Sequence, residues 1–388
     1  MKPLRLRARV ALVLGVFACA ALAAGWVRAA PGVALVAGPA TGMRVGYAQK
    51  HDLSPPLSSL PPARGLRLPP AVPTAAPGAN LDLALPAMPG PSLSWDGISR
   101  AASGCECSPP DTNGAVGRAD YVQAVNFTVQ VWTKTGSART GPVPIAALWA
   151  GFGSGCEPTV GLDPIVLYDA QADRWVLSAL GNDFNDPNDI CIAVSATGDP
   201  TGAWYRYAFK LSTNNYPDYP KLAIWPDGYY LDVNMQVPGS TQVVGQQPFV
   251  FDRAAMLRGQ AAGFQTTAAP LPQVMHMLPA DLDGPILPPA GAPDPFVGLA
   301  PPGGPPQLQL YGFHVDWAQP SQSTFNAIAT LPVDPWTYLD GGLIPQPRSQ
   351  KLLAAMGGFL MSRVGYRNFG DHESLVLNHT VAAGRSIA

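Results

Sequence analysis

The stretch PPDTNGAVG at residues 109–117, followed by the run YVQAVNFTVQVW at residues 121–132, indicates the fold class. An aspartate opens a short apolar strand, a turn follows, and a second β-rich strand comes after it. The same order starts at Asp163 and Asp218, and weaker copies start at Asp294 and Asp371. The copies are 52, 55, 76 and 77 residues apart, the scale of four-stranded propeller blades with loop insertions.

The repeats therefore predict an all-β chain, a β-propeller of about five to six four-stranded blades. Composition agrees, because 44 prolines and 40 glycines in 388 residues favour turns over long helices. Charged residues make up 13% of the chain and the formal net charge is −2. No basic patch is visible, so no nucleic-acid partner is expected.

The first 29 residues have the features of a signal peptide. Lys2, Arg5, Arg7 and Arg9 precede an apolar stretch at residues 10–22, which is short for a membrane span. We expect an exported, extracytoplasmic protein without a membrane span after cleavage. Cys19 offers the alternative of a lipid anchor, because residues 16–19 loosely match a bacterial lipobox.

Residues 30–95 are expected to form a Pro-rich linker, and residues 96–388 the propeller domain. Prolines are dense in the first segment (Pro55-Pro56, Pro61-Pro62, Pro69-Pro70), and alternation of apolar and polar residues is absent there.

Two sets of residues carry resemblances to known proteins. Residues 195–204, SATGDPTGAW, resemble the Asp box of sialidases, which stabilises a turn at a blade edge. Residues 109–117, 163–169, 218–222 and 364–374 together resemble a group of secreted bacterial β-propeller proteins, over residues 105 to 381. The resemblance implies a fold and an extracytoplasmic location, and no reaction.

That group also implies that the ring is incomplete at the C-terminus, because its members continue beyond the fifth repeat. We expect residues 374–381 to form the first strand of that repeat and to leave an unpaired edge. Leu375 and Leu377 should then be less covered than Val166 and Leu167.

The cysteines suit an oxidising compartment. Beyond the leader there are four, Cys105, Cys107, Cys156 and Cys191, with three possible pairings. We favour a bridge from Cys156 to Cys191, because both flank the strand pair that starts at Asp163. Cys105 and Cys107 could form a strained bridge or, as the alternative, a pair of metal ligands.

The candidate catalytic residues are the acids at the repeats: Asp111, Asp163, Asp218, Asp371 and Glu373. First strands line the channel of a propeller, so acids at their starts converge at one mouth. This placement resembles that in arabinanase-type glycosidases, and glycoside hydrolysis needs two carboxyl groups. The alternative is that these aspartates only cap turns. Asn113 and His372 are candidate ligand-binding residues.

No cofactor is predicted. A cluster of asparagines and aspartates could hold calcium, but it lacks the glycine and final glutamate of an EF-hand loop. It consists of Asn182, Asp183, Asn185, Asp186, Asn188 and Asp189. His372 and His379 do not have the spacing of a helical zinc motif.

Three functions stay open at this point. The first is a monomeric secreted or cell-surface propeller that binds a glycan or protein ligand at the channel mouth. The second is a glycoside hydrolase that uses the channel acids, and the third is a structural surface module without a site.

Overall fold

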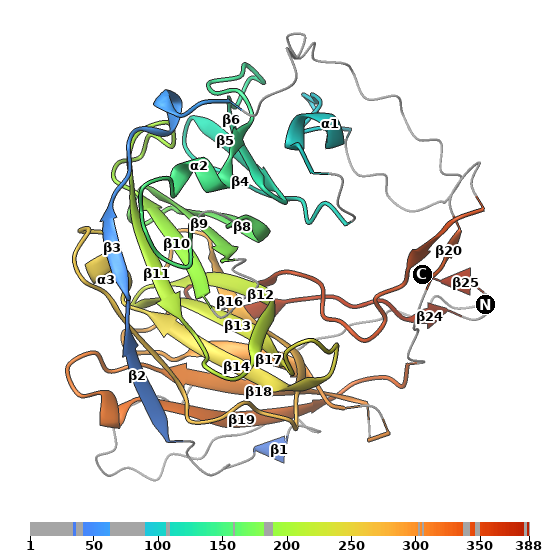
Figure 1. Ribbon diagram of the computed structural model, residues 1–388. Coiled ribbons are helices and arrows are strands. Elements are labelled where there is room, and N and C mark those ends of the chain that lie inside the picture. The colour runs from blue at the N-terminus through green and yellow to red at the C-terminus, as the bar shows by residue number, and fades with distance from the viewer. Residues whose placement is uncertain are drawn as a thin grey trace. The chain divides into compact units, whose positions relative to one another are not determined.

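A computed structural model describes residues 34–35, 42–62, 90–105, 109–157, 160–181, 189–301, 303–304, 306–336, 342–345, 350–383 and 386–387. The chain is nearly all β, as predicted, and its sheets are mostly antiparallel (Figure 1). It divides into two compact units. Unit 1 comprises Met1–Gly46, Asp218–Asp252 and Phe264–Ala388, and unit 2 comprises Tyr47–Pro217 and Arg253–Gly263.

Unit 2 contains a four-stranded sheet, β4-β5-β6-β7, and a five-stranded sheet, β3-β11-β10-β9-β8. Their strands are β3 (Lys50–Leu53), β4 (Asn113–Val116), β5 (Asp120–Val125), β6 (Thr128–Thr133), β7 (Val143–Pro144), β8 (Leu162–Asp169), β9 (Arg174–Leu180), β10 (Asp189–Ser195) and β11 (Trp204–Lys210). The short helices are η1 (Leu57–Ser59), α1 (Arg100–Ser103), α2 (Ile145–Leu148) and α3 (Arg253–Met256).

The two sheets of unit 2 share one apolar core. β8 packs against β4 and β5, and Trp149, Trp175 and Trp204 are buried in the core. Trp175 lies on β9, Trp204 on β11 and Trp149 at the end of α2, so strands and a connecting segment both contribute to this core.

The turn of residues 195–204 behaves as its likeness to an Asp box predicts. Asp199 Oδ1 accepts hydrogen bonds from the amide and hydroxyl of Thr201, at 2.9 and 2.8 Å. The Trp204 indole nitrogen donates to the Pro200 carbonyl. These bonds fix the connection from β10 to β11 and support the fold.

Unit 1 contains a five-stranded sheet, β12-β13-β14-β15-β2, and a seven-stranded sheet, β1-β19-β18-β17-β16-β22-β23. The strands are β1 (Ala34–Leu35), β2 (Met43–Tyr47), β12 (Tyr216–Trp225), β13 (Gly228–Gln236), β14 (Val243–Phe251), β15 (Gly263–Thr267), β16 (Met275–Asp283), β17 (Asp294–Leu299), β18 (Gln307–His314), β19 (Thr324–Pro332), β22 (Val364–Asn368) and β23 (Glu373–Val376). Helix η2 spans Pro320–Gln322, and two small hairpins are β20 (Gly342–Pro345) with β21 (Leu352–Ala354) and β24 (Ala382–Ala383) with β25 (Ser386–Ile387).

The structure corrects the predicted fourth and fifth repeats. The first strand of the fourth large sheet is β16, and Asp294 instead begins β17, the second strand. Asp371 lies between β22 and β23, which form one hairpin. An aspartate lies two residues before β4 and is the second residue of β8, whereas the second residue of β16 is His276. A pattern based on aspartate therefore does not identify β16.

The C-terminal hairpin extends the sheet of β16. β22 pairs in parallel with β16, in the register Ala280 to Val364, and β23 ends the sheet. The predicted strand at residues 374–381 is therefore shorter and pairs on one side with β22. Leu375 is half-buried where Val166 is buried, as expected, whereas Leu377 and Leu167 are both half-buried.

The expected linker contains ordered strands. β3 pairs with β11 in unit 2, and β2 is the outer strand beside β15 in unit 1 (Figure 1). Arg206, buried in β11, donates two hydrogen bonds to Asp52 of β3. The dense prolines predicted a linker instead of strands, but short edge strands tolerate nearby prolines.

The predicted bridge from Cys156 to Cys191 is confirmed. The Cα atoms are 5.7 Å apart, within the range of about 4.4 to 6.8 Å that a disulfide requires. Cys105 is also disulfide-bonded, whereas Cys19 and Cys107 lie outside the described residues. A disulfide is compatible with an oxidising, extracytoplasmic compartment. Within the described ranges, no helix is long and apolar enough to span a membrane.

Candidate functional site

A residue with a left-handed backbone lies within the first four residues of β8, β12 and β16, and another lies two residues before β4. These residues are Asp111, Asp163, Tyr219 and His276, with φ values of 46°, 48°, 55° and 46°. They are 52, 56 and 57 residues apart, which is more regular than the spacing of the aspartates. Left-handed geometry is uncommon outside glycine and costs most for a bulky residue such as tyrosine.

In unit 2, the Asn126 side chain joins two of these strand starts. Its Nδ2 donates to the Asp111 carboxylate at 2.6 Å and to the Pro109 carbonyl at 3.1 Å. Its Oδ1 accepts from the Asp163 amide at 2.9 Å. Asn113, a candidate ligand-binding residue, similarly accepts from the Val166 amide. The predicted acids Asp111 and Asp163 are thus brought to one region, held by a buried amide.

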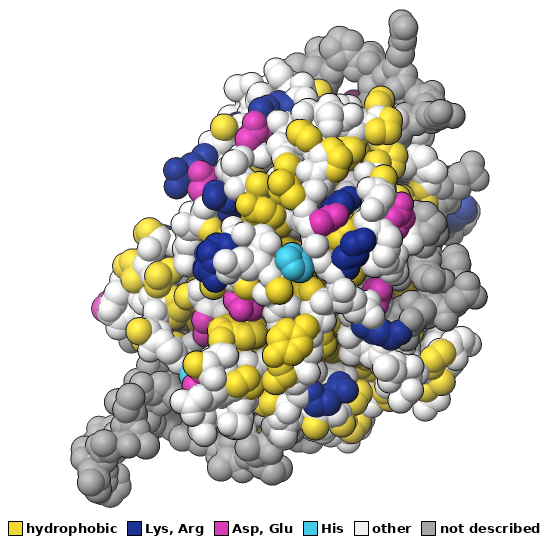
Figure 2. Space-filling view, turned by 60° about the vertical axis from the view of Figure 1, so that its left-hand side comes forward, with side chains coloured by type: hydrophobic (Ala, Val, Ile, Leu, Met, Phe, Trp, Pro, Cys, Tyr) yellow, Lys and Arg dark blue, Asp and Glu magenta, His cyan; other side chains and the backbone are white. Residues whose placement is uncertain are grey.

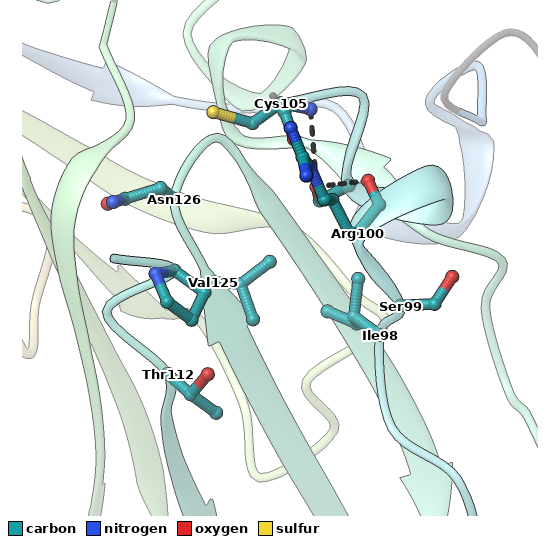
Figure 3. Close-up of a pocket in the computed structure, with 9 residues that line it drawn as sticks. Ile98, Ser99, Arg100, Cys105, Thr112, Val125 and Asn126 are labelled. Carbon is teal, nitrogen blue, oxygen red and sulfur yellow. Dashed lines mark hydrogen bonds between the residues drawn. The ribbon is translucent and has the colours of Figure 1, made fainter. Parts of the chain in front are cut away.

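A pocket of about 320 Å³ lies beside Asp111 (Figure 3). In the figure, Arg100 and Cys105 lie at one end, Thr112 lies at the other, and Ile98 and Val125 lie between them. The volume falls at the lower end of the usual range for small-molecule sites. Apolar walls with a guanidinium and hydroxyl groups suit a small polar ligand.

In unit 1, three rings meet at the remaining two strand starts. The Tyr219 and Phe359 ring centroids are 5.2 Å apart, and those of His276 and Phe359 are 3.7 Å apart. The Lys221 ammonium lies 3.3 Å from the centroid of the Tyr219 ring, a cation–π contact. Tyr219, Lys221 and Phe359 are half-buried, so part of each side chain meets solvent.

Burial shifts the pKa values of two side chains in unit 1, Asp232 and His276. Complete burial raises the pKa of Asp232, on β13, well above its ordinary value of 3.8, although Lys221 acts in the opposite direction. Burial, and secondarily the charge of Lys221, lowers the pKa of His276 from 6.5 to about 4. Both shifts favour the uncharged side chains at neutral pH.

The other candidate residues lie in unit 1. Asp218 accepts a hydrogen bond from the Gln236 amide. Asp371 is exposed and bonds to His372 at 2.8 Å, which lowers the pKa of Asp371. Glu373 begins β23, and its charge adds to the effect of burial in raising the pKa of Tyr366.

No metal centre emerges from the part of the chain that the structure describes, because no three His, Cys, Asp or Glu side chains gather there. Of the predicted calcium cluster, residues 182–188 lie outside that part, and Asp189 is buried in β10. Charged side chains of both signs are scattered over the face in Figure 2.

The sequence did not predict roles for five residues of these sites: Arg100, Asn126, Tyr219, Asp232 and His276. Alignment on the apolar runs would have found Tyr219, because it stands three residues before Leu222 as Asp163 stands before Val166. His276 and Asp232 carry no local signal, since burial and pairing across strands give them their properties.

We expect the lowered pKa of His276 to make stability pH-dependent. The unfolded chain binds a proton on this side chain below pH 6.5 and the folded chain only below about 4, so His276 destabilises the fold as pH falls through that window. Lys221 and Asp232 face the same cluster, so the wild type is compared with His276→Asn, a residue that tolerates left-handed geometry. The melting temperature of the wild type should fall more between pH 7 and 4.5. Equal falls in the two proteins would contradict the shift.

Comparisons with known proteins give little. No family model matches the chain, and no curated protein matches it. A solved structure of a GH43 β-1,3-galactosidase is 11% identical, covering 56% of this chain and 55% of that one, with a TM-score of 0.20. The match spans about half of the galactosidase chain, and at this TM-score it carries no argument. The resemblance to secreted propellers stays a prediction.

Proposed function

We propose that this chain is an extracytoplasmic β-propeller that binds a glycan in unit 2, at the pocket beside Asp111. The observation that carries this proposal is the left-handed residue near the start of β4 and of β8, the two strand starts that Asn126 joins beside this pocket, a feature repeated in β12 and β16. Strained backbone persists where the surroundings hold it, and it concentrates at functional sites.

The surroundings of the strand starts favour a saccharide over the other candidates. The pocket beside Asp111 has apolar walls, with a guanidinium and hydroxyls. The half-buried rings of Tyr219 and Phe359 offer faces on which a sugar ring can stack. Asp111 and Asp218 are each engaged by an amide side chain, which suits a structural role better than acid or base catalysis.

The test is a glycan array probed with the exported full-length chain, followed by titration of the best ligand. Arg100→Ala and Thr112→Val should weaken binding about tenfold each, the effect of losing one polar contact. Arg118→Ala, an exposed arginine of the same unit, is the matched control.

Release of reducing sugar is measured in parallel. Turnover that Asp111→Asn or Asp163→Asn abolishes would overturn simple binding and favour the hydrolase. Absence of any bound glycan, with a protein ligand captured through the same pocket, would overturn the choice of saccharide.

A further inference from the structure

Two buried polar atoms of unit 1 have no protein partner within the described residues. They are Asp232 Oδ1 and His276 Nδ1, in side chains of residues that are 2% and 8% exposed. An unsatisfied buried polar group costs about 1–3 kcal/mol, and native proteins keep few of them. Both side chains interact electrostatically with Lys221, so a ligand that bound here could satisfy both atoms.

The chemistry of the three side chains favours an oxyanion. Lys221 supplies a positive charge that acts on both Asp232 and His276. His276 Nδ1 can donate a hydrogen bond from the neutral imidazole, and burial raises the pKa of Asp232, which favours the carboxyl form that donates as well. Charge-assisted hydrogen bonds to an anionic oxygen are the strongest of their kind. The same positive charge disfavours a bound cation.

The rings define the rest of the ligand. Tyr219, His276 and Phe359 lie within 6.1 Å of one another, centroid to centroid. The Phe359 ring is tilted by 33° against the His276 imidazole, with the centroids 3.7 Å apart, so a group that reaches the imidazole has to displace Phe359. Tyr219 and His276 both have a left-handed backbone, with φ values of 55° and 46°.

We propose that Tyr219, Lys221, Asp232 and His276 form a second binding site, which takes the carboxylate of an acidic saccharide. Lys221 and the buried donors bind the carboxylate, and the rings contact the sugar face. The saccharide part rests on the proposed glycan binding, whereas the requirement for an anion rests on this cluster alone.

The experiment is calorimetric titration of the full chain at pH 7 and low salt. The probes are an oligosaccharide of glucuronate, a glucose oligosaccharide of the same length, and glucuronate itself. The acidic oligosaccharide should bind at least ten times more tightly than the neutral one. Lys221→Met and Lys221→Gln should each remove that preference, while Lys134→Met, at an exposed lysine of unit 2, should keep it.

A further variant tests the uncharged state of the buried acid. Asp232→Asn retains a donor and should bind the acidic probe as the wild type does, whereas Asp232→Leu should not. Thermal unfolding shows whether each variant is folded. If one lysine variant is not folded, the other is sufficient for the test.

Equal affinity for the acidic and neutral probes, no binding of the acidic probe, or wild-type binding by Lys221→Met would overturn this inference. Glycan binding that depends on Arg100 but not on Lys221 would overturn it and leave the proposed function standing. Acidic binding that depends on Lys221 but not on Arg100 would support it and reject the pocket of unit 2.

Discussion

Loss of the bond between Cys156 and Cys191 is expected to lower the free energy of unfolding by about 4 kcal/mol. The bridge closes a loop with a sequence separation of 35 residues, and the chain-entropy relation for a loop of this length gives that size of effect. Both cysteines are fully buried, so alanine is the suitable replacement because serine would bury a hydroxyl.

The measurement is urea unfolding of the wild type and of Cys156→Ala/Cys191→Ala, both without reductant. The bond at Cys105 is then present in each protein, and reductant added to the double variant reports the contribution of that second bond. A loss below about 1 kcal/mol would show that strain or residual structure in the unfolded chain cancels the constraint.

Replacement of Arg253 by methionine is expected to destabilise the protein by about 3–5 kcal/mol, the usual cost of leaving a buried charge unpaired. Arg253 Nε and Nη2 donate to the Asp169 carboxylate at 2.6 and 2.9 Å. The Asp169 side chain is fully buried and that of Arg253 is 11% exposed. Methionine preserves much of the apolar stem and removes the charge.

Two further variants make this expectation specific. Arg258→Met, five residues along the same segment at an exposed arginine, should change stability by less than about 0.5 kcal/mol. Adding Asp169→Leu to Arg253→Met should recover part of the loss, because an apolar replacement of both partners removes the unpaired charge. No recovery would mean that the arginine acts through packing.

The sequence predicts the parts of this fold that have local signals. The strand pairs after Asp111 and Asp163, the turn at residues 195–204 and the pairing of Cys156 with Cys191 were all visible in the pattern of residues. Alternation, turn residues and cysteine placement are local or nearly local properties.

The parts that the sequence did not predict depend on distant contacts. The parallel pairing of β22 with β16 joins residues more than 80 positions apart, and β2 and β3 gain their structure only from the sheets whose edges they extend. Tyr219 and His276 take the position held elsewhere by aspartate, so the aspartate pattern places the third repeat one residue early and does not identify the fourth.

Unit 2 includes residues 253–263, which are synthesised after much of unit 1, so its stability depends on the order of synthesis. This segment belongs to unit 2, but in the sequence it lies between β14 and β15, which are both strands of a unit 1 sheet. A nascent chain that ends at Pro217 lacks the Arg253 guanidinium. It therefore either buries the Asp169 carboxylate without its partner or leaves that part of the core unfolded. Since residue 253 emerges only after β12 to β14, folding of the earlier sheets waits for the later ones, and we expect the two units to become resistant to proteases together.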